Sequence, residues 1–208
     1  MTIIYLVRHS EPFKIHYGIE DVNESILISN IKSPLSVDGE KLAEKISNNS
    51  EFKNIDVVWC SNYVRTMSTA KYFAYNNNLK VNVSDKIGER IHGVDSWEQL
   101  PKNFEIKQFE DENYKIGVGE SQKEVRERFK DFINNLLKEY KDKRILIVGH
   151  STATAYLLGE WCEINYNGSY KFNGNEFFDG NWNYCETFKL IFDENNNLKS
   201  INNLKFNT

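Results

Sequence analysis

The chain has 208 residues, 40% of them hydrophobic and 27% charged, which is typical of a globular protein with one full-sized core. Its net charge of −4 gives no general reason to expect nucleic acid or an anionic membrane as a partner. Three cysteines without a CxxC pair argue against a disulfide framework. The first apolar run, residues 3–7, is too short for a signal peptide or a membrane span. These features together predict a cytoplasmic protein.

The N-terminal half alternates between short apolar runs and helical patterns. Residues 3–7 (IIYLV) are rich in β-branched side chains, which predicts a strand buried on both faces. A helix entered at Ser36 is expected over 36–48, and residues 57–60 (VVWC) repeat the pattern of a buried strand. Residues 61–75 then predict a second helix.

The C-terminal half continues this alternation before it changes character. Residues 121–140 carry one apolar stripe at helical spacing, and Ser121 with Glu124 forms a capping box at its start. Residues 145–148 (ILIV) predict another buried strand, followed by a helix over 151–161 opened by Ser151. Two further strands are expected at 186–192 and 198–206, around an Asn-rich turn.

Buried strands that alternate with amphipathic helices predict an α/β fold. We expect a three-layer α/β/α sandwich with a mostly parallel sheet and an antiparallel C-terminal edge. Residues 1–208 are expected to form a single domain. Residues 88–120 and 163–185 fit poorly into regular elements, and we interpret both as excursions over the active site, the first as a lid-like insertion.

Reactive side chains follow three of the predicted strands. The first strand runs into Arg8-His9-Ser10, the second into Ser61 with Arg65 close behind, and the third into Gly149-His150-Ser151. Because ligands bind at the carboxyl ends of parallel strands, these clusters are expected to converge. Two arginines, two histidines and helix N-termini suit a dianionic phosphoryl group. There is no Gly-rich P-loop, and the four histidines lack HxxxH or HExxH spacing.

These residues also carry a family resemblance. LVRHSEP (6–12) resembles the LxRHGE signature of the histidine phosphatase superfamily, in its phosphoglycerate mutase-like branch. Further segments resemble the family's motifs in the same order along the chain: SPLSVDG (33–39), SNYVRTMSTA (61–70), GERIHG (88–93), GESQKEVRER (119–128) and VGHSTATAYLL (148–158). Ordered recurrence of so many segments is far more specific than one motif.

The resemblance implies a role for each matching residue. His9 would attack phosphorus, and Arg8, Arg65 and His150 would bind the phosphoryl oxygens. Glu89 would protonate the leaving oxygen and then activate the water that hydrolyses the phosphohistidine. The resemblance implies neither a cofactor nor a metal.

Other side chains have less direct interpretations. Ser10 and Ser151 are expected to contact the substrate, although Ser61 and Ser151 also suit helix caps. His16 and His92 are expected to make local hydrogen bonds, and Arg128 a structural ion pair.

Two departures from the family pattern bear on the activity. Ser10 stands where the family usually has glycine, so its side chain narrows the pocket or adds a hydroxyl. Ile15 stands where mutases and several phosphatases carry an asparagine, and residues 88–120 contain no concentrated basic cluster for a second phosphate. The loss of the asparagine at position 15 and the absence of a basic cluster in 88–120 favour hydrolysis over a mutase reaction.

Three functions remain open on the sequence alone. The leading hypothesis is a phosphomonoester hydrolase acting on a small phosphorylated metabolite, the second an isomerase of the phosphoglycerate mutase type, and the third a catalytically silent phosphate-binding regulatory domain. The expected partner is a small phosphorylated substrate, with neither nucleic acid nor membrane. The C-terminal edge strand would also permit a homodimer.

Overall fold

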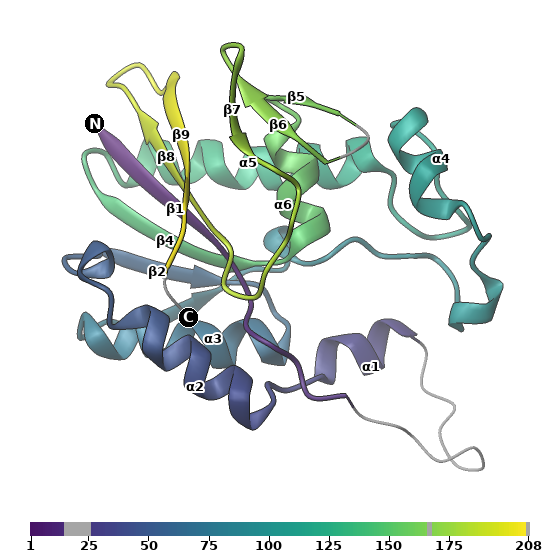
Figure 1. Cartoon of the computed structure of the whole chain (residues 1–208), viewed down its shortest axis with the longest axis horizontal. Coiled ribbons are helices and arrows are strands. Elements are labelled where there is room, and N and C mark those ends of the chain that lie inside the picture. The colour runs from purple at the N-terminus through teal and green to yellow at the C-terminus, as the bar shows by residue number, and fades with distance from the viewer. Residues whose placement is uncertain (15–25, 166–167, 207–208) are drawn as a thin grey trace.

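The computed structural model describes residues 1–14, 26–165 and 168–206. A six-stranded sheet with the order β3-β2-β4-β1-β8-β9 forms its centre (Figure 1). The first four strands in this order, which are mutually parallel, are β3 (Val81–Val83), β2 (Val57–Cys60), β4 (Arg144–Gly149) and β1 (Thr2–Arg8). Strands β8 (Thr187–Phe192) and β9 (Leu198–Leu204) complete the edge in antiparallel pairing. The predicted mostly parallel sheet with an antiparallel C-terminal edge is therefore confirmed.

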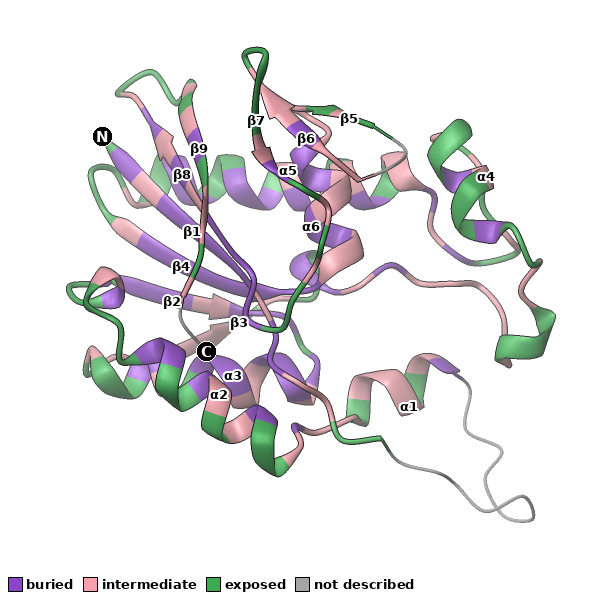
Figure 2. Ribbon diagram, viewed as in Figure 1, coloured by how far each residue is buried: buried purple, intermediate pink, exposed green. Residues whose placement is uncertain are grey.

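Helices cover both faces of this sheet and give the predicted three layers (Figure 1). On one face lie α2 (Val37–Ser47) and α3 (Val64–Asn76), and on the other α5 (Gln122–Glu139) and α6 (Ser151–Leu158). Alternate side chains of β1 supply both cores. Ile4 and Leu6 pack with the α5 and α6 layer, whereas Tyr5 and Val7 pack with the α2 and α3 layer. Figure 2 shows the sheet buried between helices whose outer faces are exposed.

The starts of the helices test the predicted caps. Ser36 accepts a hydrogen bond from the Gly39 amide at the start of α2, and the capping box of Ser121 and Glu124 is formed at α5. The cap predictions at Ser61 and Ser151 are wrong. Tyr63 occupies the cap position of α3, and His150 occupies that of α6, so that Ser151 is already helical.

The remaining segments contain short elements. Helix α1 (Ile26–Lys32) precedes α2, and the short helix η1 (Ser50–Phe52) follows it. A second short helix, η2 (Asp85–Ile87), follows β3. Residues 88–120 contain η3 (Trp97–Gln99) and α4 (Phe104–Glu110). Beyond α6, a separate antiparallel sheet consists of β5 (Glu163–Ile164), β6 (Tyr170–Phe172) and β7 (Asn175–Phe178). None of the described helices has the length and apolar character needed to cross a membrane.

The small sheet gives residues 163–185 more regular structure than their sequence pattern indicated. Strands β6 and β7 are joined by Asn173 and Gly174, whose φ angles are 50° and 77°. Positive φ at both turn residues is what a two-residue hairpin requires, and Asn-Gly is the strongest sequence signal for it. The Asn-Gly pair was therefore the available signal for this hairpin.

Candidate active site

The register of the two central strands brings His9 and His150 together. Arg8 pairs with Gly149 across β1 and β4, and the His9 amide donates to the Gly149 carbonyl at 2.9 Å. Each histidine directly follows its strand, so both rings reach the same edge of the sheet, with centroids 5.3 Å apart. His9 is 6% exposed and His150 is fully buried. The predicted convergence of these two segments is confirmed.

The backbone fixes the protonation pattern of His9. Its Nδ1 lies 2.7 Å from the Ser10 carbonyl oxygen, which can only accept a hydrogen bond. We therefore assign the ring proton to Nδ1, which leaves the lone pair of Nε2 available. Burial, followed by the charge of Arg65 and then that of Arg8, holds the pKa of His9 well below its ordinary value of 6.5. His9 is consequently neutral near pH 7.

Arg65 enters the site from the first turn of α3 and is only 5% exposed. Its Nη2 lies 3.2 Å from His150 Nδ1, and its Nη1 donates to the Asn30 carbonyl oxygen at 2.5 Å. The guanidinium also lies over the Tyr63 ring, 4.7 Å from the ring centroid. Helix α1 therefore helps to orient Arg65 through the Asn30 carbonyl. Nothing in the sequence indicated this role for α1.

Arg8 is held by the chain that leads into β8. Its Nη1 donates to the Trp182 carbonyl oxygen at 2.8 Å, and its guanidinium lies over the Tyr184 ring at 4.8 Å. The buried Nε of Arg8 has no hydrogen-bond partner among the described residues. The Tyr184 ring centroid also lies 6.5 Å from that of His9, so Tyr184 and the Trp182 carbonyl both lie beside the site.

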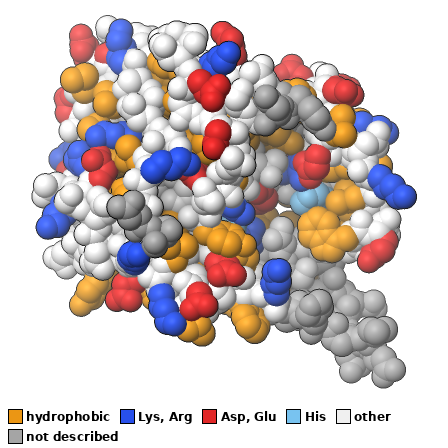
Figure 3. Space-filling view, viewed as in Figure 1, with side chains coloured by type: hydrophobic (Ala, Val, Ile, Leu, Met, Phe, Trp, Pro, Cys, Tyr) orange, Lys and Arg blue, Asp and Glu red, His pale blue; other side chains and the backbone are white. Residues whose placement is uncertain are grey.

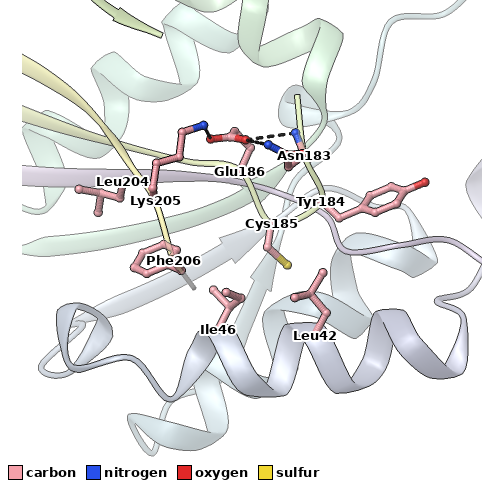
Figure 4. A pocket seen from close by; sticks show the side chains of 9 residues that line it. All are labelled: Leu42, Ile46, Asn183, Tyr184, Cys185, Glu186, Leu204, Lys205 and Phe206. Carbon is pink, nitrogen blue, oxygen red and sulfur yellow. Dashed lines mark hydrogen bonds and ion pairs between the residues drawn. The ribbon is translucent and has the colours of Figure 1, made fainter. Parts of the chain in front are cut away.

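Figure 4 shows that neighbouring side chains of residues 183–186, just before β8, point in different directions. The Tyr184 side chain extends away from α2, whereas the sulfur of Cys185 points toward Leu42 on that helix. A cavity of about 350 Å³ lies between α2 and this segment. At its wall the Glu186 carboxylate accepts hydrogen bonds from the side chains of Asn183 and Lys205. Cys185 has a φ of 56°, which lies in the left-handed region that residues other than glycine rarely adopt.

Glu89 lies at the N-terminus of α6. Its Oε1 accepts from the backbone amides of Arg90 and Ala153, each at 2.9 Å, and its Oε2 accepts from Thr152 at 3.4 Å. The carboxylate acts electrostatically on both site arginines, where its charge offsets part of the lowering of their pKa by burial. The structure therefore gathers Glu89 with Arg8, Arg65 and His150.

The two serines predicted to contact substrate have different surroundings. The Ser10 hydroxyl is fully buried and donates to the Gly39 carbonyl oxygen at 2.7 Å, so it is engaged with α2. Ser151 lines a cavity of about 260 Å³ together with Thr152, Tyr156 and Trp182. Contact of Ser151 with a substrate stays a prediction, whereas the hydroxyl of Ser10 already has its acceptor.

A buried arginine beside Glu89 escaped the sequence interpretation. Arg90 is 4% exposed and makes a two-pronged ion pair with Glu105, at 2.7 and 2.8 Å. It also donates to Gln108 at 2.7 Å and lies 2.8 Å from His92 Nε2. This cluster joins α4 to the chain that carries Glu89. The expected local bond of His92 is confirmed, as is the ion pair of Arg128, with Glu120 at 2.6 Å.

Two further expectations concern residues 15 and 16. Ile15, the departure from asparagine, and His16 both lie outside the described residues.

Within residues 1–14, 26–165 and 168–206, no group of three or more His, Cys, Asp or Glu side chains could hold a metal ion. Figure 3 shows acidic and basic side chains interspersed over one face of the molecule.

Comparisons with known proteins identify proteins similar to this chain in sequence and in fold. The sequence is 28% identical over 164 residues to phosphoserine phosphatase 1 of Hydrogenobacter thermophilus, covering 73% of this chain and 72% of that protein. The fold is similar to that of a mycobacterial glucosyl-3-phosphoglycerate phosphatase in complex with inorganic phosphate, with a TM-score of 0.69, 15% identity and coverage of 99% and 97%.

A second solved structure, phosphoserine phosphatase of Entamoeba histolytica in complex with 3-phosphoglyceric acid, has a TM-score of 0.63, 17% identity and coverage of 97% of each chain. The family model of the histidine phosphatase superfamily (branch 1) matches residues 4–184. Taken with the paired histidines and their arginines, this match establishes that the chain belongs to the histidine phosphatase superfamily.

Proposed function

We propose that this protein is a metal-independent phosphomonoester hydrolase that acts on a small phosphorylated metabolite through a phosphohistidine on His9. The observation that carries the proposal is the state of the His9 ring. Its Nδ1 proton is held by the Ser10 carbonyl, and its neutral Nε2 is buried beside two guanidinium groups. A neutral imidazole nitrogen next to fixed cations is what attack on a phosphoryl dianion requires.

The reaction follows from this arrangement in two steps. His9 Nε2 attacks phosphorus while the bond to the ester oxygen breaks, and Glu89 gives that oxygen its proton. Water then attacks the phosphohistidine, Glu89 takes a proton from the water, and the P–N bond breaks to release phosphate. Arg8, Arg65 and His150 bind the equatorial oxygens and stabilise their charge in both transition states.

Hydrolysis is favoured over a mutase reaction by the state of Arg90. A mutase must hold a second phosphoryl group, and Arg90 is a buried cation adjoining Glu89. Its guanidinium is already engaged by Glu105, Gln108 and Tyr156. This occupancy supports water as the acceptor. The relatives named as phosphatases of phosphoserine and glucosyl-3-phosphoglycerate support a small metabolite as the substrate.

The proposal is tested with a generic aryl phosphate and a panel of phosphorylated metabolites, in the presence of a chelator. We expect release of inorganic phosphate and an acid-labile phosphoryl label on the protein after rapid quenching. His9→Ala should abolish both, whereas His92→Ala, which removes a histidine outside the phosphoryl pocket, should still be labelled. Undiminished turnover in a folded His9→Ala variant would refute the mechanism.

The two other functions give distinct results in the same experiment. Interconversion of phosphoglycerates that depends on a bisphosphate primer would identify a mutase. Phosphate binding without any label or turnover across the panel would identify a silent binding domain.

A further inference from the structure

Both ring nitrogens of His150 have partners inside the protein. Nδ1 lies 3.2 Å from Arg65 Nη2, and Nε2 lies 2.8 Å from Ser61 Oγ. A guanidinium can only donate hydrogen bonds, so Nδ1 must be the acceptor in the first contact. The proton of neutral His150 therefore resides on Nε2 and is donated to Ser61.

The hydrogen bonds continue from Ser61 in a fixed direction. Ser61 Oγ lies 2.7 Å from Thr66 Oγ1, which in turn donates to the Tyr63 carbonyl oxygen at 2.7 Å. Because a carbonyl can only accept, each hydroxyl accepts from the preceding group and donates to the next. We call Ser61 and Thr66 the hydroxyl relay. His150 and both relay residues are fully buried, so protein atoms alone set this direction.

The topology of the sheet explains why the relay reaches His150. Cys60 pairs with Val148 across β2 and β4, and the Ser61 amide donates to the Val148 carbonyl at 3.2 Å. Ser61 therefore leaves the sheet next to the strand that carries His150, and Thr66 follows in the first turn of α3. The same helix supplies Arg65, whose guanidinium contacts the other ring nitrogen of His150, Nδ1.

We propose that Ser61 and Thr66 are positioning residues that keep the proton of His150 on Nε2, so that Nδ1 faces the phosphoryl pocket and takes up a proton from solvent when a phosphoryl dianion binds. This inference rests on the proposed phosphoryl site. The chemical change is formation of one N–H bond at Nδ1, which then donates to a phosphoryl oxygen. Ser61 Oγ stays the acceptor of the Nε2 proton, so the imidazolium has both N–H groups paired.

The charges around His150 explain why the dianion is needed. The groups that act on it are Arg65 and the Tyr63 ring at the start of α3, Arg8 and His9 at the end of β1, and Arg128 on α5. Burial, then Arg65 and the other cationic groups, hold the pKa of His150 well below 6.5 in the ligand-free protein. A bound dianion compensates these positive charges and favours the protonated ring. His150 would thus be neutral without ligand and charged with it.

The first experiment needs no turnover. Nitrogen NMR of histidine-labelled protein should find ligand-free His150 as the neutral Nε2–H tautomer. Sulfate is the probe for binding because it remains a dianion across the working pH range. Calorimetry in buffers of different ionisation enthalpy should give about one proton taken up per sulfate bound near pH 7. An Nδ1–H tautomer, or sulfate that binds without proton uptake or does not bind, would overturn the inference.

Thr66 supplies a matched pair of variants. Thr66→Val keeps the shape but removes the acceptor of the Ser61 proton, which then turns to His150 Nε2 and opposes the Nε2–H tautomer that Arg65 favours from the other side of the ring. Thr66→Ser keeps the hydroxyl and should resemble the unmodified protein. We expect Thr66→Val to lose most of the proton uptake and about tenfold in kcat/KM, and Ser61→Ala to lose about ten- to a hundredfold.

The readouts separate this inference from the proposed function. Thr66→Val that matches Thr66→Ser in tautomer, proton uptake and kcat/KM would refute the relay, whatever the enzyme does. Conversely, the expected tautomer and proton uptake in a protein that never forms a phosphohistidine would refute the hydrolase and leave the relay standing. Melting curves of each variant confirm that the compared proteins are folded.

Discussion

Three histidines should make the stability of this protein fall steeply between pH 7 and pH 5.5. The folded state holds the pKa of His9 and His150 well below 6.5, and that of His92 at about 4, in each case chiefly because of burial. In the unfolded chain these imidazoles regain their ordinary pKa. The unfolded state therefore binds more protons as the pH falls through 6.5, and the free energy of unfolding decreases.

The size of this loss of stability follows from the histidine pKa in the unfolded chain alone, as long as the pKa values in the folded protein lie below pH 5.5. Each fully buried histidine then contributes about 1 kcal/mol of lost stability between pH 7 and pH 5.5. His92 is partly exposed and adds at most a similar amount, so the total is about 2 to 4 kcal/mol. Carboxylates with lowered pKa, such as Glu51, lose their contribution only at more acidic pH, since their ordinary value is 4.5.

Urea unfolding followed by tryptophan fluorescence, at constant ionic strength and without phosphate, measures this loss directly. His9→Gln should remove about one histidine's share, or about 1 kcal/mol, of the difference between the two pH values. Two results would refute the assignment of these rings as neutral in the folded state. One is a free energy of unfolding that does not change between pH 7 and pH 5.5. The other is a loss of stability between these pH values that is undiminished in both His9→Gln and His150→Gln.

Three further substitutions test the packing around the site. In Gly39→Ala the added Cβ would lie 2.2 Å from the Glu11 carbonyl oxygen, so thermal unfolding should report a loss of about 1–3 kcal/mol. Phe129→Ala empties a fully buried position in α5 and should cost about 3–5 kcal/mol in urea unfolding, against less than about 0.5 kcal/mol for the exposed Glu127→Ala. Arg90→Met removes the ion pair to Glu105 and should speed hydrogen exchange in α4 about tenfold, whereas the exposed Lys102→Ala should not. Unchanged exchange in Arg90→Met would show that α4 is held by other contacts.

The sequence predicted best those features that depend on local pattern. The apolar runs of β1 and β4 identified central strands, and the stripe and capping box of α5 identified its start. Convergence of His9 and His150 followed from the rule that parallel strands share a carboxyl edge. These inferences needed only neighbouring residues and one topological regularity.

Features that depend on particular tertiary contacts could not be predicted in this way. Ser61 looked like a helix cap, but its hydroxyl contacts His150, a partner fixed only by the register of β2 and β4. Nothing in the sequence singled out Arg90, because its ion pair needs α4 to bring Glu105 to it. The position of Glu89 at the N-terminus of α6 likewise joins residues far apart in the chain. Single-residue propensities contain none of this information.

The place of β1 in the sheet has a consequence for synthesis of the chain. This strand leaves the ribosome before the other described strands, yet its two neighbours, β4 and β8, begin at Arg144 and Thr187. At 5–20 residues per second, roughly 10 to 40 s separate the appearance of β1 from that of β8. During that interval an apolar strand has one or both hydrogen-bonding edges open, a known template for aggregation. A nascent chain that stalls before β8 would therefore carry both histidines and still be at risk of aggregating through β1.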